Sequence, residues 1–132
     1  MLLATAGITQ ARLSFILRAI PLAAFGGRGA EAVNRIIFGK QPVHPDAVKF
    51  MNAIMTHFKA RVAALPLLSD DELRGLSMPL LLVVGAKDAL YNSAATAARL
   101  ESLAPNLKVM MLPEMGHVLY GLSGKIAPFL TA

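Results

Sequence analysis

The sequence predicts an α/β fold with a short parallel sheet flanked by helices, and two observations support this. Residues 76–132 alternate apolar strand-like runs with helix-like segments, an order typical of parallel strands joined by helices. Residues 1–75 instead place apolar side chains three and four positions apart, which indicates helices. We therefore divide the chain into residues 1–75, a strand stub with a helical region, and residues 76–132, a core segment of strands and helices.

The elements of residues 1–75 are predicted from apolar spacing and from residues that cap or break helices. Proline lacks the N–H that a helix interior needs, glycine suits the position after a helix, and a serine followed three residues later by glutamate starts one. The predicted elements are a strand stub at 1–4, a helix at 13–20 stopped by Pro21, a helix at 30–38 capped by Gly39, a helix at 46–65, and a short helix through Arg74 that opens on Ser69 and Glu72.

The elements of residues 76–132 follow from two apolar runs. The run at 79–84 is continuous, which is typical of a strand buried on both faces of a parallel sheet. Pro105 and Asn106 form a turn before the second run. The predicted elements are a strand at 79–84, a helix capped by Asn92 or Ser93 that runs to Leu103, a strand at 107–112, and an amphipathic segment at 119–130.

The composition is unusually apolar for one small domain. The 132 residues are 55% hydrophobic, with a mean hydropathy of +0.56. Yet no window reaches the roughly 18 uninterrupted apolar residues of a membrane span, because Arg18 and Pro21 interrupt the best candidate, 13–25. We therefore expect no membrane span, and an apolar surface that a second copy or a missing N-terminal half covers.

The charge and the side-chain inventory exclude several classes of function. The chain has no cysteine, which excludes disulfides and thiolate metal sites and permits a reducing, cytoplasmic location. Its net charge of +5 is spread along helical segments without any tryptophan, so the sequence predicts no nucleic-acid binding. No pattern predicts a cofactor or a metal site.

An acid and a histidine follow the two predicted strands. Asp88 comes shortly after the first strand, and His117 comes shortly after the second. Loops at the carboxyl ends of parallel strands share one edge of the sheet, where strands lie about 4.8 Å apart. We therefore expect the two side chains to form a hydrogen bond that orients the imidazole as a general base. Tyr91 and Tyr120 flank the loops and are expected to pack near the same cleft.

These residues stand in a pattern that resembles a known family. The stretches MPLLLVVGAKDALYN and PNLKVMMLPEMGHVLYGLSGKIAPFL resemble the C-terminal portion of α/β-hydrolase-fold enzymes, the esterase and lipase-like group. The resemblance implies that Asp88 is the acid and His117 the base of a catalytic triad, 29 residues apart. It also implies that residues 1–75 form a helical cap, with LLATAG resembling the strand before it.

One departure from that family concerns the nucleophile. The family carries it in Gly-x-Ser-x-Gly, upstream of the acid. The six serines of this chain are Ser14, Ser69, Ser77, Ser93, Ser102 and Ser123, and none stands in that motif. The resemblance therefore implies a partial α/β-hydrolase fold, inactive alone, whose nucleophile precedes Met1.

Two functions remain open from the sequence. One is a carboxylesterase-like hydrolase that needs its missing part, and the other is a non-catalytic dimerising or binding module derived from a hydrolase. For the first, apolar side chains of the helical region suggest a small apolar ester as substrate, with most of them packed inside. They are Phe38, Phe50, Met51, Met55 and Phe58.

Overall fold

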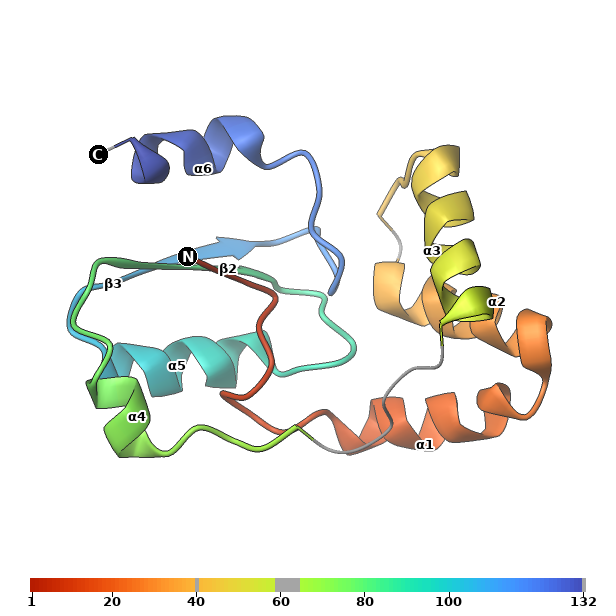
Figure 1. Cartoon of the computed structure of the whole chain (residues 1–132), viewed down its shortest axis with the longest axis horizontal. Helices are drawn as coiled ribbons and strands as arrows, with labels where there is room; N and C mark the ends of the chain where they lie inside the picture. The colour runs from red at the N-terminus through yellow and green to blue at the C-terminus, as the bar shows by residue number, and fades with distance from the viewer. Residues whose placement is uncertain (40, 59–64, 132) are drawn as a thin grey trace.

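A three-stranded parallel sheet organises the computed structural model, which describes residues 1–39, 41–58 and 65–131 (Figure 1). The elements are β1 (Leu2–Leu3), α1 (Leu13–Ala23), α2 (Gly26–Phe38), α3 (Pro45–His57), α4 (Asp70–Arg74), β2 (Leu80–Gly85), α5 (Ser93–Leu103), β3 (Leu107–Leu112) and α6 (Ser123–Leu130). Helices α4 and α5 lie on one side of the sheet and α6 on the other, while α1, α2 and α3 extend away from it. The predicted α/β fold with a short parallel sheet is confirmed.

Strand β2 is the centre of the sheet. It pairs in parallel with β1, where Leu82 lies opposite Leu2, and with β3, where Leu80 lies opposite Leu107. All six residues of β2 are buried, as the continuous apolar run predicts. The short strand β1 also confirms the predicted stub.

The side chains of β2 alternate between two cores because successive residues of a strand point to opposite faces. Leu82 and Val84 pack towards α4 and α5, whereas Leu81 and Val83 pack towards α6. The core on the α5 side consists of Ile8, Leu73, Leu82, Val84, Ala97 and Leu100. The core on the α6 side consists of Leu81, Val83, Leu112 and Leu122, with Ile126 and Phe129 packed against it.

Two predicted helix ends are wrong. Helix α1 continues past Pro21 to Ala23. Proline lacks the N–H but keeps its carbonyl, which accepts the N–H of Ala24 at 3.2 Å. Helix α3 ends at His57, since Phe58 is extended, with φ −105° and ψ 128°. The expected continuation over residues 59–64 lies outside the described residues.

The remaining caps follow the sequence. Gly39 ends α2 with φ 67°, a left-handed conformation that favours glycine, although α2 starts at Gly26, earlier than predicted. Asn92 caps α5 by accepting the N–H of Ala95 at 3.2 Å. Ser69 and Glu72 form the predicted capping box at the start of α4.

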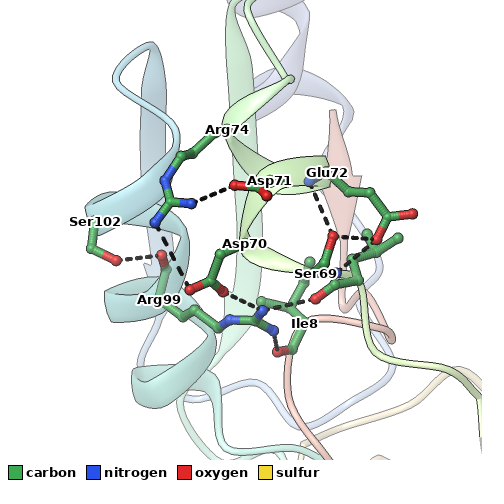
Figure 2. Close-up of polar contacts among 9 residues, drawn as sticks. Ile8, Ser69, Asp70, Asp71, Glu72, Arg74, Arg99 and Ser102 are labelled. Carbon is green, nitrogen blue, oxygen red and sulfur yellow. Dashed lines mark hydrogen bonds and ion pairs between the residues drawn. The ribbon is translucent and has the colours of Figure 1, made fainter.

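Arg99 of α5 binds the two segments that enter and leave the helical region (Figure 2). Its guanidinium donates to the carbonyl of Ile8 at 2.6 Å and to the carbonyl of Leu68 at 2.8 Å. A third bond reaches the carboxylate of Asp70 at 2.6 Å and holds the pKa of that acid below its ordinary value. The segments that enter and leave the helical region therefore lie side by side on α5.

Within the described ranges, no helix is both long enough and apolar enough to cross a membrane.

Candidate active site

The loops after β2 and β3 bring an acid and a histidine together. Strand β2 ends at Gly85 and β3 ends at Leu112, so Asp88 and His117 follow adjacent parallel strands at one edge of the sheet. The Nδ1 atom of His117 lies 2.9 Å from Oδ2 of Asp88. The predicted hydrogen bond between the two side chains is confirmed.

Asp88 is a buried carboxylate, and both of its side-chain oxygens have hydrogen-bond partners. Its side chain is 2% exposed, and Oδ1 accepts the backbone N–H of Leu90 at 2.7 Å and of Tyr91 at 3.0 Å. Burial raises the pKa of Asp88, but the hydrogen bonds from His117, Tyr91 and Leu90 and the charge of His117 together outweigh burial. The pKa of Asp88 therefore lies below its ordinary value, and the group is ionised at neutral pH.

The carboxylate fixes the orientation of the His117 ring. Because the ionised Oδ2 of Asp88 only accepts, Nδ1 of His117 carries a proton, and in the neutral ring Nε2 is the nitrogen with the lone pair. The side chain is 21% exposed, and no other described side chain bonds to the ring. An imidazole held in this way can take a proton at Nε2 from a neighbouring hydroxyl or water.

Tyr91 packs beside the pair, as predicted. Its ring centroid lies 5.7 Å from that of His117, with the planes tilted by 46°. Burial, and then the charge of Asp88, raise the pKa of Tyr91, so the phenol is neutral at physiological pH. Tyr120 donates its hydroxyl to the carbonyl of Pro42 in the helical region, and its place near the same cleft stays a prediction.

Two glycines let the loops approach backbone to backbone. A Cβ on Gly85 would lie 2.2 Å from the carbonyl oxygen of Gly116 and 2.3 Å from that of Met115. A Cβ on Gly116 would lie 2.9 Å from the carbonyl oxygens of Ile37 and Phe38 at the end of α2. We call the loop after β2 that carries Asp88 the acid loop, and the loop after β3 that carries His117 the histidine loop. Larger residues at these two positions would push the acid loop, the histidine loop and α2 apart.

The helical region contacts the acid loop through Arg12. The backbone N–H of Arg12 donates to the carbonyl of Leu90 at 2.8 Å, and its Nε donates to the carbonyl of Tyr91 at 3.1 Å. Arg12 precedes α1, and no sequence pattern predicts this contact with residues nearly eighty positions away. The start of α1 is thereby fixed against the loop that holds Asp88.

Gln41 makes the equivalent contact with the histidine loop. Its side-chain amide donates to the carbonyl of Val118 at 2.8 Å and accepts the N–H of Gly116 at 3.2 Å. The N–H of His117 itself donates to the carbonyl of Ile37 at 3.2 Å. Like Arg12, Gln41 stands in no recognisable motif and is found only from the structure.

The serines do not complete a triad within the described residues. Ser93 is buried and donates to the carbonyl of Gly85 at 2.6 Å, while Ser123 starts α6 on the surface. No described hydroxyl bonds to His117. The part of the chain that is described therefore supplies an oriented base without a nucleophile.

The apolar residues proposed for substrate contact divide between surface and interior. Phe50 and Phe58 are 66% and 73% exposed, so the expectation that most of these residues pack inside is wrong for both. Phe38, the last residue of α2, is buried at 6% exposure. Met51 is half-buried, and the side chain of Met55 lies outside the described residues.

Comparison with solved structures identifies the fold. The chain superimposes on carboxylesterase CesB (YbfK) from Bacillus subtilis with a TM-score of 0.71, at 23% identity over 97% of its residues. A putative hydrolase from Bacillus subtilis matches 94% of the chain with a TM-score of 0.75 and 22% identity. The chain has a partial α/β-hydrolase fold. Naproxen esterase (carboxylesterase NP) from Bacillus subtilis also shares this fold, with a TM-score of 0.64, 22% identity and 91% coverage.

The α/β-hydrolase fold is only partly represented here. The chain spans 46%, 48% and 43% of the lengths of these three neighbours, somewhat under half. No protein-family model and no curated protein matches the sequence. The resemblance in fold inferred from the motifs around Asp88 and His117 is thus confirmed, while the catalytic roles of the two residues stay predictions.

Proposed function

We propose that this chain carries the acid and the base of a serine hydrolase that acts on esters. The observation that supports this is the 2.9 Å contact between Asp88 Oδ2 and His117 Nδ1, with Asp88 buried and Nε2 of His117 unpaired among the described residues. A general base needs this combination of a fixed tautomer and a free lone pair. The solved neighbours include two carboxylesterases.

In the proposed reaction, Nε2 of His117 takes the hydroxyl proton of a serine as its oxygen attacks the ester carbonyl. The carboxylate of Asp88 stabilises the imidazolium that results. His117 then returns the proton to the departing alkoxide, which leaves as an alcohol, and an acyl group remains on the serine. Water, deprotonated by the same Nε2, releases the acid and restores the serine.

The serine and the oxyanion donors would come from residues outside this sequence. None of the six serines stands in Gly-x-Ser-x-Gly, and the chain spans under half the length of each of the three solved neighbours. The exposed Phe50 and Phe58 would suit a small apolar ester as substrate, and the lack of cysteine permits a cytoplasmic location. Reading the DNA upstream of the Met1 codon for an in-frame Gly-x-Ser-x-Gly is the quickest check.

The decisive experiment measures hydrolysis of p-nitrophenyl acetate and butyrate. The 132-residue chain should not exceed free imidazole, because one missing oxyanion donor alone costs about 2.7–4 kcal/mol in the transition state. A longer polypeptide that supplies the serine motif should turn over both esters. His117→Ala should then abolish turnover, while His57→Ala, which alters an exposed histidine at the end of α3, should not.

Two results would redirect the proposal. Saturable turnover by the chain alone that is lost in His117→Ala would mean that these residues include a nucleophile, and Ser123 would be mutated first. An inactive longer polypeptide would favour the second function, a dimerising or binding module. The apolar side chains exposed on α1 favour that function specifically, since Leu13 and Leu17 are 68% and 64% exposed.

A further inference from the structure

The backbone of the histidine loop around His117 is held by the helical region. The N–H of Gly116 donates to Oε1 of Gln41 at 3.2 Å, and Nε2 of Gln41 donates to the carbonyl of Val118 at 2.8 Å. Between these two bonds, the N–H of His117 donates to the carbonyl of Ile37 at 3.2 Å. Within the described ranges, the backbone of these three loop residues makes no hydrogen bond to the strands.

The acid loop is held by the sheet itself. The N–H of Ala86 donates to the carbonyl of Leu112 at 2.9 Å, where β3 ends, and the N–H of Lys87 donates to the carbonyl of Met115 at 2.9 Å. These bonds continue the pairing of β2 with β3 up to the residue before Asp88. Beyond Met115, the histidine loop leaves this pairing and bonds to the helical region instead. The contact between the acid and the base therefore joins a part placed by the strands to a part placed by the helical region.

This contact depends on the position of the His117 backbone. The Nδ1 atom of His117 lies 2.9 Å from Oδ2 of Asp88, and a hydrogen bond weakens steeply when its geometry degrades. The two bonds of Gln41 lie on either side of His117 in the chain, so they hold its backbone from both sides. The glutamine side chain is uncharged, so it does this without adding a charge near the ring.

We propose that Gln41 is a positioning residue, which holds the backbone of His117 so that Nδ1 keeps its proton and its bond to Asp88. Without the two bonds of Gln41, the histidine loop moves away from Asp88 and the neutral ring shares its proton between Nδ1 and Nε2, because the bond made by one nitrogen decides which of them is protonated. Fewer molecules then have the lone pair at Nε2. That this slows catalysis rests on the proposed ester hydrolysis, whereas the place of the proton does not.

The test is NMR spectroscopy of the ¹⁵N-labelled chain of 132 residues. Correlations from the carbon-bound ring protons to the two ring nitrogens show which nitrogen carries the proton. Spectra are recorded at about pH 9, well above the ordinary histidine pKa of about 6.5, so that neutral rings are observed. His117, assigned by the signal that is missing in His117→Ala, should carry its proton on Nδ1 in the wild-type chain. The exposed His57 serves as the internal reference.

Two variants of Gln41 test its role. Gln41→Met keeps the length of the side chain and removes both bonds, so the ratio of the Nε2–H form to the Nδ1–H form of His117 should rise about tenfold. Gln41→Glu keeps the size and an acceptor for Gly116 but has no donor for Val118. The ratio should rise in this variant too, which keeps the test valid if Gln41→Met does not fold.

Asn106→Leu is the matched control. The side-chain nitrogen of Asn106 donates to the carbonyl of Ser77 at 2.7 Å, which is the same kind of bond. Both residues precede strands, so the bond lies at the opposite edge of the sheet from His117. This variant should leave the proton of His117 on Nδ1, which separates positioning of the base from a general loss of stability.

The longer polypeptide of the ester assay gives a second measurement. Gln41→Met should lower its kcat about tenfold or more, because the base is displaced, and should change its KM by less than about twofold. If that polypeptide is inactive while the NMR effect is present, the ester hydrolysis is wrong and the positioning role stands.

Three results would overturn the proposal. They are a proton on Nε2 of His117 in the wild-type chain, an unchanged ratio of the two forms in both Gln41→Met and Gln41→Glu, and an equal change in Asn106→Leu.

Discussion

The sheet region buries its apolar side chains, whereas the helical region of α1 to α3 leaves many of its apolar side chains exposed. Strand β2 buries all six residues between α5 and α6. Helix α1 instead leaves Leu13, Leu17 and Ile20 exposed by 68%, 64% and 66%. Among the described residues of α1 to α3, the buried apolar side chains are Val33 and Phe38. Stability therefore resides in the sheet, and the helical region offers apolar surface that other groups can cover.

The two regions meet at a few polar contacts rather than through a shared core. Arg99 holds the ends of the helical region on α5, Arg12 bonds to the acid loop, and Gln41 bonds to the histidine loop. Each joins segments far apart in the sequence. The candidate site lies at this junction, since Arg12 and Gln41 bond to the loops that carry Asp88 and His117.

The largest effect is expected from a deletion in the sheet core. Leu82→Ala removes a fully buried side chain from β2 and should lower the free energy of unfolding by about 2–5 kcal/mol, through lost burial and the cavity left behind. Leu17→Ala deletes the same atoms from exposed α1 and should stay within about 0.5 kcal/mol. Urea denaturation measures both. Equal losses would contradict the division between the two regions.

The next effect is expected at the junction, from Asp88→Asn. Above about pH 5 the variant should lose about 1.5–3 kcal/mol of stability, because the carboxylate bonds of a buried group disappear. The folded pKa of Asp88 lies below the ordinary value of 3.8, so its contribution is present above that value and is lost as the pH falls through the folded pKa. The gap between wild type and variant should therefore close in acid.

Asp46→Asn is the control for this pH dependence. Asp46 lies at the start of α3 with a side chain 75% exposed, so its replacement should change stability by less than about 0.5 kcal/mol. Urea denaturation at a series of pH values gives both curves. A gap for Asp88→Asn that widens as the pH falls would show that Asp88 is not stabilised as a carboxylate.

The sequence predicts the sheet region better than the helical region, for a physical reason. The continuous apolar run of β2 indicates a strand buried on both faces of a parallel sheet, and the loops that follow adjacent parallel strands share one edge of the sheet. This is why the contact between Asp88 and His117 could be predicted. Phe58 continues the apolar spacing of α3 yet is 73% exposed, and spacing alone does not tell where a helix without a covering partner ends.

The contacts of Arg12, Gln41 and Arg99 could not be predicted for a different reason. Each side chain bonds mainly to backbone carbonyl or N–H groups, which every residue type offers. No pairing of residue types therefore appears in the sequence. The partners are chosen by how the chain folds back on itself, and only the structure shows it.

A smaller effect is expected when the ends of the helical region are released. Arg99→Met keeps much of the side-chain length but leaves the carbonyls of Ile8 and Leu68 without their donor (Figure 2). Ile8 is 2% exposed, so its unpaired carbonyl should cost about 1–3 kcal/mol. Arg99→Lys should not restore the loss, because an ammonium lacks the planar fork that reaches both carbonyls.

Hydrogen exchange locates the Arg99 effect. In Arg99→Met, protection should fall around residues 7–8 and 68–70, where the two segments lie side by side on α5, and should remain unchanged in β2. Arg18→Met serves as a control on α1, where the side chain is exposed. Uniform loss of protection across β2 would mean that Arg99 supports the sheet itself rather than the junction.

Substitutions on the exposed face of α1 are expected to change the free energy of unfolding least of all. They should nevertheless change the oligomeric state of the chain. Leu17 and Ile20 lie three residues apart on this helix, and both are largely exposed. A contiguous apolar face of this kind favours association with a second copy. We therefore expect the wild-type chain to sediment as an oligomer at micromolar concentration. The double variant Leu17→Lys, Ile20→Lys should sediment as a monomer, because charge on this face cannot be buried without a partner.

The control separates this face from the edges of the sheet. Leu3 of β1 is 44% exposed at one edge, where pairing with another strand is the alternative route to association. Leu3→Lys should leave the oligomer intact if α1 forms the contact, and should dissociate it if edge pairing does. Either variant should change the free energy of unfolding of the monomer by less than about 1 kcal/mol, since these side chains are already exposed. A wild-type chain that stays a compact monomer at micromolar concentration would show that the apolar face of α1 does not drive self-association.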